Sequence, residues 1–400
     1  MKRRLLPILM TLVLVCALPI WAAFVTSGDV TNPLVSTAGA TLPDLQAKID
    51  AAEDNATITL DSDTTITETL VITGKTLTID LNGHVLKMTG DGSVLRVSDR
   101  ATLTITDSRP QNPHTGSYAG LPAGGVITGG KADKGGGILL AGGCTLKLTG
   151  GCITDCHATD TGGGGVVLNG DTAILYMSGT ARIENCTAGE TWGANAIFNS
   201  GTMYADGGTV DGTVNNQGTI MLSEGAAAET VFNGTVYNRS AGTIKAGRYN
   251  ETVENRGTIT GGIFYGGVTN DGGKINDGAY ETVTFNSDGG TPVEEAKVLR
   301  GQKVAKPTDD PTKSGYTFTG WEDANGAGAY DFNTPVIAPL TLTAKWEKNP
   351  SSGGYYYYPT PDTKADDAKG SPKTADPGVA LYAALSILSL TGLTCTAKKR

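Results

Sequence analysis

Four cysteines in the middle of the chain could bind a metal ion or cross-link the fold. They are Cys144, Cys152, Cys156 and Cys186, and the other two of the six cysteines lie near the ends of the chain. Cys152 and Cys156 are far from any second pair of ligands, which a tetrahedral zinc site requires. The four lie in one region, so they do not cross-link the whole chain as in small secreted scaffolds. Whether any of them forms a disulfide stays open.

Five asparagines recur at short intervals, three of them in the pattern Asn-x-Gly-Thr. Their spacings are 17, 22, 17 and 15 residues, and they are Asn199, Asn216, Asn238, Asn255 and Asn270. Asparagine tolerates left-handed turns, and identical amides stacked about 4.8 Å apart can hydrogen-bond to one another. We therefore predict a structural ladder. A calcium or sugar site is the alternative, disfavoured because no carboxylate accompanies the amides.

The surrounding segment has the composition of many short strands. From Ala123 to Thr291 there is no proline, glycine is abundant, and apolar residues come in bursts of two to five. Proline is excluded from strands that are paired on both sides, because it cannot donate to the ladder. The pattern therefore predicts interior β-strands and excludes helices.

Internal repeats indicate how these strands are arranged. Residues 137–140 recur at 165–168, residues 146–150 at 175–179, and residues 153–156 at 183–186, at offsets of 28, 29 and 30. Repeats of this size are typical of a solenoid whose units bury their apolar face only against neighbours. Each offset would span one or two coils. Cys156 and Cys186 would then stack as a buried apolar pair one coil apart or two.

The segment before this region continues the same pattern. Short apolar runs, each of the length of a strand, recur between Thr57 and Asp107. Ahead of them, Thr41 to Asp44 has the spacing of a capping box with Pro43 just inside, and Leu42, Leu45 and Ile49 share one helical face. We expect a short amphipathic helix that covers the first coil, because an open coil is an unpaired edge.

Residues 41–280 resemble the right-handed parallel β-helix of pectate-lyase-like proteins, on these strands and on the turn Asp80-Leu81-Asn82-Gly83-His84. The resemblance implies polysaccharide lyases and hydrolases as relatives, so an enzyme is an alternative. Such chemistry needs clustered carboxylates and a basic side chain. The candidates are Asp155, Asp160, Asp171, Glu184, Arg182 and His157.

These candidates do not form a motif in the sequence. Asp155 and Glu184 occupy different positions of the repeated strand, next to turns where aspartate is common for backbone reasons. The three histidines, His84, His114 and His157, share no motif with a carboxylate or a serine. We therefore expect no catalytic residue, no cofactor and no metal site.

A second module is expected over residues 281–347. Its segments Val283 to Asn286, Pro311 to Trp321 and Leu340 to Trp346 resemble the Listeria-Bacteroides repeat, also called the internalin B-repeat. Tyr316, Phe318 and Trp321 bracket a turn expected at Gly320, and the aromatic side chains supply a core to a domain this small. The resemblance implies a small β-grasp-like spacer or interaction module of bacterial surface proteins. Trp321 and Trp346 are expected in the core rather than at a ligand.

Both ends of the chain predict export. Residues 1–23 have three basic residues, an apolar run and a small-residue end, as a secretory signal peptide does. Residues 379–397 are uncharged and mostly apolar, long enough at about 1.5 Å per residue to span a bilayer as a helix, and Lys398-Lys399-Arg400 follows. Without residues 1–23 and 375–400 the formal charge falls from −9 to −14. A chain this acidic is repelled by nucleic acid, which we exclude as a partner.

Residues 371–400 resemble the cell-wall sorting signal of Gram-positive surface proteins. The five residues of the motif are Ser371, Pro372, Lys373, Thr374 and Ala375. The resemblance implies that a sortase attacks the carbonyl of Thr374 and transfers the protein to peptidoglycan. Pro372 and Thr374 match the usual Leu-Pro-x-Thr-Gly, and Ser371 and Ala375 depart from it. A plain membrane anchor is the alternative.

Residues 348–370 lack periodicity and mix glycine, serine, proline and four tyrosines, so they are expected to form an extended tether. Together these features predict an all-β, wall-attached surface protein. Its expected function is binding or adhesion to an extracellular glycan or protein through the long face of the solenoid. A polysaccharide lyase or glycoside hydrolase is the alternative. An unbroken face of threonine and asparagine ladders would favour binding, and converging carboxylates would favour the enzyme.

Overall fold

The structure is a computed structural model that describes residues 42–160, 162–189, 194–324 and 328–350. The chain divides into two compact units, 1–348 and 349–400. The expected signal peptide, the tether beyond residue 350, the sorting motif and the membrane segment 379–397 lie outside the described residues. Within the described ranges, no helix is both long enough and apolar enough to cross a bilayer.

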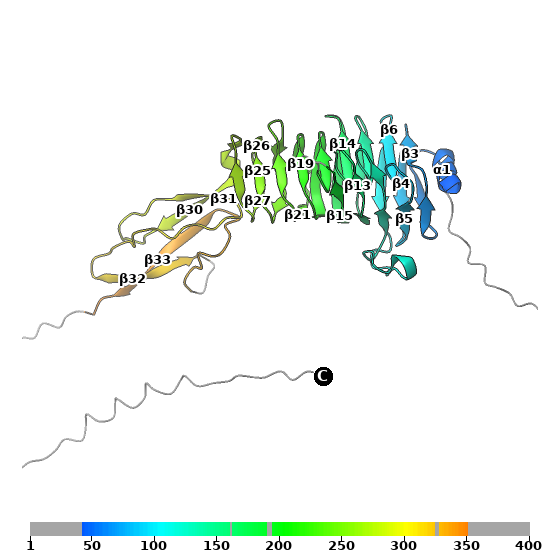
Figure 1. Cartoon of the computed structure of the whole chain (residues 1–400). Coiled ribbons are helices and arrows are strands. Elements are labelled where there is room, and N and C mark those ends of the chain that lie inside the picture. Colours follow the sequence, from blue (N-terminus) through cyan, green and yellow to red (C-terminus); the bar gives the residue numbers. More distant parts are fainter. Residues whose placement is uncertain (1–41, 161, 190–193, 325–327, 351–400) are drawn as a thin grey trace, which may run out of the picture. The chain divides into compact units, whose positions relative to one another are not determined.

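Residues 56–275 form a parallel β-helix with three faces, which confirms the expected fold class (Figure 1). In each coil the chain runs along face 1, then face 2, then face 3, and enters the next coil. Faces 1 and 2 belong to one 17-stranded sheet because β15 and β18 run through both, and face 3 is a nine-stranded sheet.

Face 1 contains β1 (Ala56–Thr59), β4 (Thr76–Asp80), β7 (Thr102–Thr106), β11 (Thr145–Leu148), the first parts of β15 (Ile174–Glu184) and β18 (Thr202–Val210), β20 (Thr219–Met221), β23 (Thr243–Ile244), β26 (Thr258–Ile259) and β29 (Lys274–Ile275). Face 2 contains β2 (Thr64–Ile66), β5 (Val85–Met88), β8 (Val126–Thr128), β12 (Cys152–Thr154), the last parts of β15 and β18, β21 (Val231–Phe232), β24 (Arg248–Tyr249) and β27 (Ile263–Phe264).

Face 3 contains β3 (Leu70–Thr73), β6 (Leu95–Ser98), β10 (Ile138–Ala141), β14 (Val166–Asn169), β17 (Ile197–Asn199), β19 (Val214–Asn216), β22 (Val236–Asn238), β25 (Val253–Asn255) and β28 (Val268–Asn270). Three short strands between faces 2 and 3 form a separate small sheet, β9 (Lys131–Ala132), β13 (His157–Ala158) and β16 (Thr187–Ala188).

The core of the solenoid consists of columns, each column being one strand position repeated in successive coils. One inward column of face 1 is entirely apolar and buried, and it runs through Leu77, Leu103, Leu146, Leu175, Met203 and Ile220. On face 2 the inward column becomes aromatic, with Phe232, Tyr249 and Phe264 stacked at centroid distances of 4.9 and 5.1 Å. Alternation of inward and outward residues along each short strand produces these columns.

The strand registers show that each internal repeat spans one coil. Ile138 pairs with Val166, Leu146 with Leu175, and Ile153 with Ile183. Of the two spacings that the sequence left open, one coil is therefore correct. Cys156 and Cys186 accordingly occupy adjacent coils, where the backbone N–H of Thr187 donates to Cys156 O at 2.9 Å.

The helix α1 (Leu42–Ala51) packs on the first coil through Leu45 and Ile49, both in the core. Gln46 caps the edge strand β3, because its side-chain Oε1 accepts from Val71 N at 2.9 Å and its Nε2 donates to Val71 O at 3.1 Å. Lys75 Nζ donates to the carbonyls of Ile49, Asp50 and Ala52 at 2.9–3.1 Å and so caps the carboxyl end of α1. The helix thus covers backbone groups that an open edge would expose.

The second module is a four-stranded sheet in the order β31-β30-β33-β32. Its strands are β30 (Tyr280–Asn286), β31 (Ala296–Leu299), β32 (Tyr316–Asp323) and β33 (Leu340–Lys348), and the central pair β30–β33 is parallel. Trp321 is buried and Trp346 partly buried in its core, where Trp346 Nε1 donates to Ser287 O at 3.0 Å.

One local expectation for this module was wrong. Gly320 does not form a turn, because β32 continues through it and the register with β33 shifts between Phe318 and Gly320, which marks a β-bulge. Its φ of +145° is a conformation that glycine adopts far more readily than other residues.

The chain after β31 hydrogen-bonds to the last coil of the solenoid. Phe264 N donates to Arg300 O at 2.8 Å, and Gln302 Nε2 donates to the carbonyls of Phe264 and Tyr265. Arg300 also forms an ion pair with the buried Glu281. These contacts satisfy edge groups of the solenoid at the end opposite to α1.

Candidate functional site

The outward surface of face 1 carries the longest regular array of polar side chains in the described part of the chain. One outward column, called column A, consists of threonine in seven of eight consecutive coils, and the register continues to Lys274 in the coil after them. Its members in the eight coils are Thr76, Thr102, Thr145, Ile174, Thr202, Thr219, Thr243 and Thr258. All eight side chains are half-buried by one another. Neighbouring members are about 4.8 Å apart along the solenoid.

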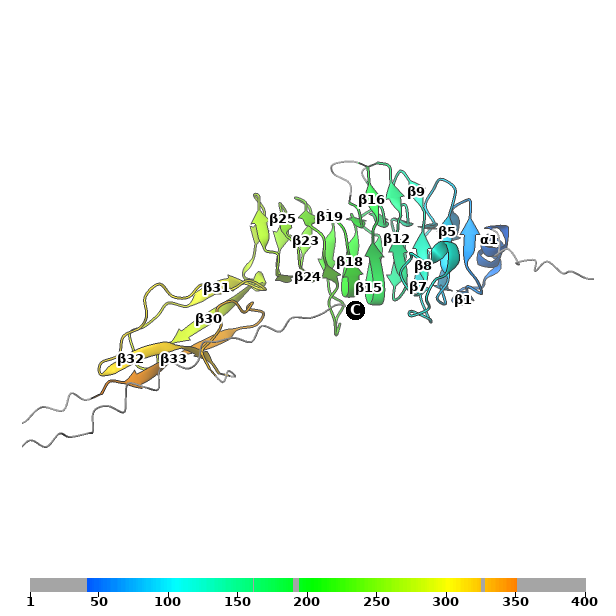
Figure 2. The same cartoon turned by 60° about the horizontal axis from the view of Figure 1, so that its bottom comes forward.

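A second outward column on face 1, called column B, lies two residues along each strand from column A. It contains Thr78, Thr104, Lys147, Tyr176, Tyr204, Met221, Lys245 and Thr260. Two positions along a parallel strand are about 6.6 Å apart. The two columns therefore form a lattice in which most positions carry a hydroxyl group. Figure 2 draws the backbone of the face 1 strands that carry it, among them β7, β15, β18 and β23.

The centre of column B is a stacked pair of tyrosines. The rings of Tyr176 and Tyr204 are 4.5 Å apart and nearly parallel, with 4° between their planes, and Lys147 Nζ lies 6.0 Å from the Tyr176 centroid. Burial and the neighbouring Tyr204 and Asp206 raise the pKa of Tyr176. Since the usual tyrosine pKa is already about 10, this phenol stays protonated at physiological pH and can both donate and accept.

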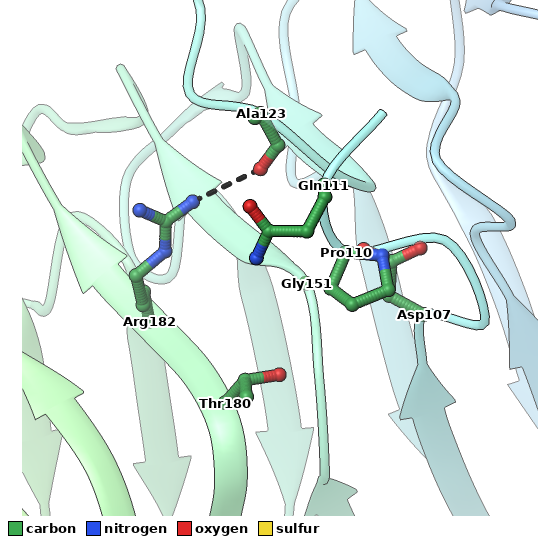
Figure 3. Close-up of a pocket in the computed structure, with 7 residues that line it drawn as sticks. All are labelled: Asp107, Pro110, Gln111, Ala123, Gly151, Thr180 and Arg182. Carbon is green, nitrogen blue, oxygen red and sulfur yellow. Dashed lines mark hydrogen bonds between the residues drawn. The ribbon is translucent and has the colours of Figure 1, made fainter. Parts of the chain in front are cut away.

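Face 2 carries a different feature, a cleft of about 230 Å³ at the edge of loop 107–125 (Figure 3). This loop connects β7 to β8, contains the 3-10 turn η1 (Gly116–Tyr118), and packs Tyr118 and Leu121 on outward residues of face 2. The sequence signal that could have identified it is proline at positions 110, 113 and 122, just before the proline-free segment begins.

The charged residues of this cleft hold the loop in place. Asp107 Oδ1 accepts from Gly83 N at 2.7 Å and Arg109 N at 3.2 Å, and its Oδ2 accepts from Gly125 N at 2.6 Å. Arg182 Nη2 donates to Ala123 O at 3.1 Å, as Figure 3 shows. The Asp107 carboxylate thus has three backbone donors, which is the arrangement of a loop-fixing residue.

The structure does not gather the candidate acid–base residues in this cleft, whose lining includes Arg182 but none of the four candidate carboxylates. Asp155 is in a left-handed turn with φ of 50°, and Asp160 and Asp171 lie in exposed turns after β13 and β14. Glu184 ends β15 beside Cys152. Among the described residues, no group of three or more His, Cys, Asp and Glu side chains could hold a metal ion.

The three histidines serve separate local contacts. His84 Nδ1 lies 3.5 Å from Asp63 Oδ1, His114 Nε2 lies 2.7 Å from Gly124 O, and His157 Nδ1 lies 2.8 Å from Thr187 Oγ1. Each histidine therefore has its own separate partner, and the three do not form a common acid–base site.

The cysteines Cys144, Cys152, Cys156 and Cys186 are free thiols and buried. A hydrogen bond to Cys186 and burial raise the pKa of Cys156, and burial and Glu184 raise the pKa of Cys152 far above its usual value. A thiol is nucleophilic only as the thiolate. Both thiols are therefore protonated and buried at neutral pH, Cys156 in the core of the solenoid and Cys152 under loop 107–125.

The five repeated asparagines form a continuous side-chain ladder inside the solenoid. Each Nδ2 donates to the Oδ1 of the next asparagine, at 2.7–2.8 Å, in the order Asn199, Asn216, Asn238, Asn255 and Asn270. The first four side chains are fully buried. In the earlier coils the same column is apolar, with Ile72, Val97, Leu140 and Leu168, and Leu168 pairs with Asn199.

A second, shorter ladder was not anticipated from the sequence. Asn233 Nδ2 donates to Asp211 Oδ1 at 2.5 Å, and Asn250 Nδ2 donates to Asn233 Oδ1 at 2.7 Å. These residues directly follow the inward column Val210, Phe232, Tyr249 of face 2. The signal was available, because Asn233 and Asn250 are 17 residues apart, as two neighbouring pairs of the longer ladder are.

A smaller cleft of about 190 Å³ lies at the outer side of the asparagine ladder. Arg239 lies over the Tyr237 ring at 4.9 Å, and Arg256 forms an ion pair with Asp271 at 2.7 Å. Burial and the nearby Arg256 lower the pKa of Arg239. With Glu254 also in the lining, the charges of this corner balance.

Comparison with known proteins identifies one family match, in the second module. Residues 282–345 match the family model of the Listeria-Bacteroides repeat domain. A 70-residue segment is 40% identical to a protein of Evansella cellulosilytica named as a Gly-rich membrane protein, and a 70-residue segment is 39% identical to one of the same organism named as a membrane protein. Each match covers 17% of this chain, and the chain spans 8% and 10% of the two relatives. No solved structure matches the chain.

Proposed function

We propose that this chain is a non-catalytic binding protein displayed at a bacterial cell surface. The observation that carries the proposal is the hydroxyl lattice of columns A and B, which extends over eight coils of face 1. It supports binding because a long, regular and rigid array suits recognition of an extended ligand. Glycoside hydrolysis uses a pair of carboxylates, whereas the larger cleft is lined by one, that of Asp107, and in the smaller cleft the Asp271 carboxylate is already bound to Arg256.

The surface location is part of the same proposal. It is supported by the match of residues 282–345 to a repeat domain whose resemblance implies surface proteins, and by two relatives named as membrane proteins. The signal-like residues 1–23 and the sorting-like residues 371–400 add export and attachment to peptidoglycan by a sortase, through cleavage after Thr374. The β-helix would then be held outward from the wall by the module and the tether.

A binding screen run in parallel with a product assay tests the proposal. The purified full chain is applied to a glycan array and to extracellular matrix proteins, and the same glycans are incubated with it and analysed for reducing ends and unsaturated products. We expect binding without product. Released product would contradict the proposal and favour the lyase or hydrolase alternative, and absence of binding to every probe would contradict it as well.

Attachment is tested separately by a processing assay. In the bacterium that produces the protein, Thr374→Ala is expected to abolish covalent attachment to peptidoglycan, so that detergent alone extracts the chain. The matched control is Thr363→Ala in the tether, which should leave attachment unchanged. Detergent extraction of the unaltered chain to the same extent would support the plain membrane anchor instead.

A further inference from the structure

We propose that face 1 binds an extended, electrically neutral polysaccharide that lies along columns A and B. This inference rests on the proposed binding function and specifies its surface and its ligand class. The array reaches from the coil of Thr76 to that of Thr258, which is seven coil steps and about 34 Å at the usual strand spacing. Such a length fits a chain of several sugar units rather than a single one.

Hydroxyl side chains match a polyhydroxylated ligand chemically. A threonine or tyrosine hydroxyl donates one hydrogen bond and accepts others, as each sugar hydroxyl does. The threonine hydroxyls of column A have no hydrogen-bond partner recorded among the described residues, in contrast to Thr149 and Thr230, whose hydroxyls donate to backbone carbonyls. Column A can therefore bond to a ligand without breaking internal contacts.

The array is also stiff before any ligand binds. Threonine is β-branched and restricted at χ1, and each residue of columns A and B belongs to or directly follows a short strand paired on both sides. Side chains that are already ordered lose little entropy on binding. The Tyr176–Tyr204 stack orders two phenols in the same way.

Charge favours a neutral polymer over an acidic one. Over these eight coils, columns A and B carry two basic residues, Lys147 and Lys245, and two acidic residues, Asp80 and Asp206, flank column B. Lys274 adds one positive charge in the coil that follows. Both carboxylates accept backbone N–H groups, from Asn82 and Ser108 and from Ser223. The positive and negative charges of these eight coils are therefore equal in number. The whole chain has a net charge of −9 and repels polyanions at long range.

The same surface is poorly suited to a protein partner. Protein interfaces depend on a few large apolar or arginine anchors in a desolvated centre. Columns A and B offer only Ile174 and Met221 as aliphatic members, and the tyrosine rings cover each other rather than a partner. A polar polymer that contacts many equivalent hydroxyls fits the surface better.

The test is calorimetric titration of the full chain in detergent with neutral and acidic oligosaccharides. The probes are the hexamers and dimers of cellulose, chitin and β-1,3-glucan, with hexagalacturonate as the acidic probe. We expect at least one neutral hexamer to bind more tightly than its dimer and more tightly than hexagalacturonate. The gain with length follows because adjacent sugar units bind as one linked ligand.

Variants locate the binding to face 1. The double variant Thr202→Val and Thr219→Val removes two hydroxyls from column A and keeps the β-branched shape, so we expect about a tenfold loss of affinity. Tyr204→Phe, which removes only a phenol hydroxyl, should lose a few-fold. Matched controls are Thr209→Val on face 2 and Thr269→Val on face 3, which should bind as the unaltered chain does.

Each outcome decides the inference. Binding of a neutral hexamer that weakens with the face 1 variants and not with the controls supports it. Equal affinity of all variants, or binding of hexagalacturonate or of a protein alone, overturns it while the proposed binding function stands. If no neutral hexamer binds in the titration, the inference is overturned. If the glycan-array and matrix-protein screen also finds no binding, or if product is released, both are overturned. Denaturation midpoints of all variants, expected to be unchanged, exclude loss of fold as the cause.

Discussion

At the scale of single residues, the change from leucine to asparagine in one inward column shows how a small polar side chain can replace an apolar core. The two residues Ser200 and Gly201 connect β17 to β18, so the chain turns tightly there. Asn199 Oδ1 accepts from Gly201 N at 3.0 Å, and its Nδ2 donates to Asn216. The amide thus satisfies the turn and stacks on its neighbour, which a leucine could not do.

Removing one interior member of this ladder is expected to destabilise the fold. Asn216→Ala takes a partner from both Asn199 and Asn238, which are fully buried, so we expect a loss of about 2–4 kcal/mol in the free energy of unfolding. Asn270→Ala, at the exposed end of the ladder, should lose about 1 kcal/mol or less. Urea denaturation followed by circular dichroism measures both, and equal losses would contradict the ladder's energetic role.

Tyr249 gives a prediction for alkaline pH. Burial and Glu229 raise its pKa well above the usual value, so the folded chain keeps a proton that the unfolded chain releases near pH 10. Stability therefore falls as pH rises above about 10. Tyr249→Phe keeps the stack with Phe232 and Phe264 but loses the hydrogen bond to Ala246 O, at a cost of about 1 kcal/mol at pH 7.

At pH 11 the same substitution should cost less or become stabilising, because phenylalanine has no proton to lose. The measurement is the urea midpoint of both proteins at pH 7 and pH 11. An unchanged difference between them would show that Tyr249 ionises equally in both states.

At the scale of elements, the sequence predicted most of what local pattern encodes and missed what depends on tertiary contacts. The strand repeats and the longer asparagine ladder follow from spacing, because each coil repeats the same positions, and the cap helix follows from its capping box and apolar face. The shorter ladder was missed although its spacing was present. Whether an offset of 28 residues spans one coil or two depends on the size of the corners, which no local pattern fixes. The bulge at Gly320 and the packing of loop 107–125 on face 2 depend on tertiary contacts such as that of Asp107.

The cap helix makes a testable contribution at the first edge. Gln46→Ala removes both bonds to Val71, so we expect a loss of about 1–2 kcal/mol and a tendency of molecules to associate through the exposed β3 edge. Lys48→Ala is the matched control, since its ion pair with Asp61 spans 3.9 Å and is exposed, and it should change stability little. Light scattering and thermal denaturation measure the two effects. A monomeric Gln46→Ala variant of full stability would contradict a role for this cap.

At the scale of the whole molecule, binding depends on which surfaces of the solenoid stay uncovered. The solenoid has both ends covered, by α1 and by the chain that follows β31, so its open surfaces are its faces rather than its edges. Loop 107–125 packs on part of face 2, and the small sheet β9-β13-β16 lies between faces 2 and 3. Among the residues that the structure describes, face 1 has no such cover and carries the hydroxyl lattice, so we expect it to meet ligands outside the cell.

One experiment on intact host cells tests this most directly. Single cysteines are placed on the three faces, as Thr202→Cys, Thr209→Cys and Thr269→Cys, and cells are treated with a membrane-impermeant maleimide, with the unaltered chain as background. We predict that all three variants are labelled, and that an excess of the neutral hexasaccharide protects Thr202→Cys alone. Labelling only after lysis, or equal protection of all three positions, would contradict the account.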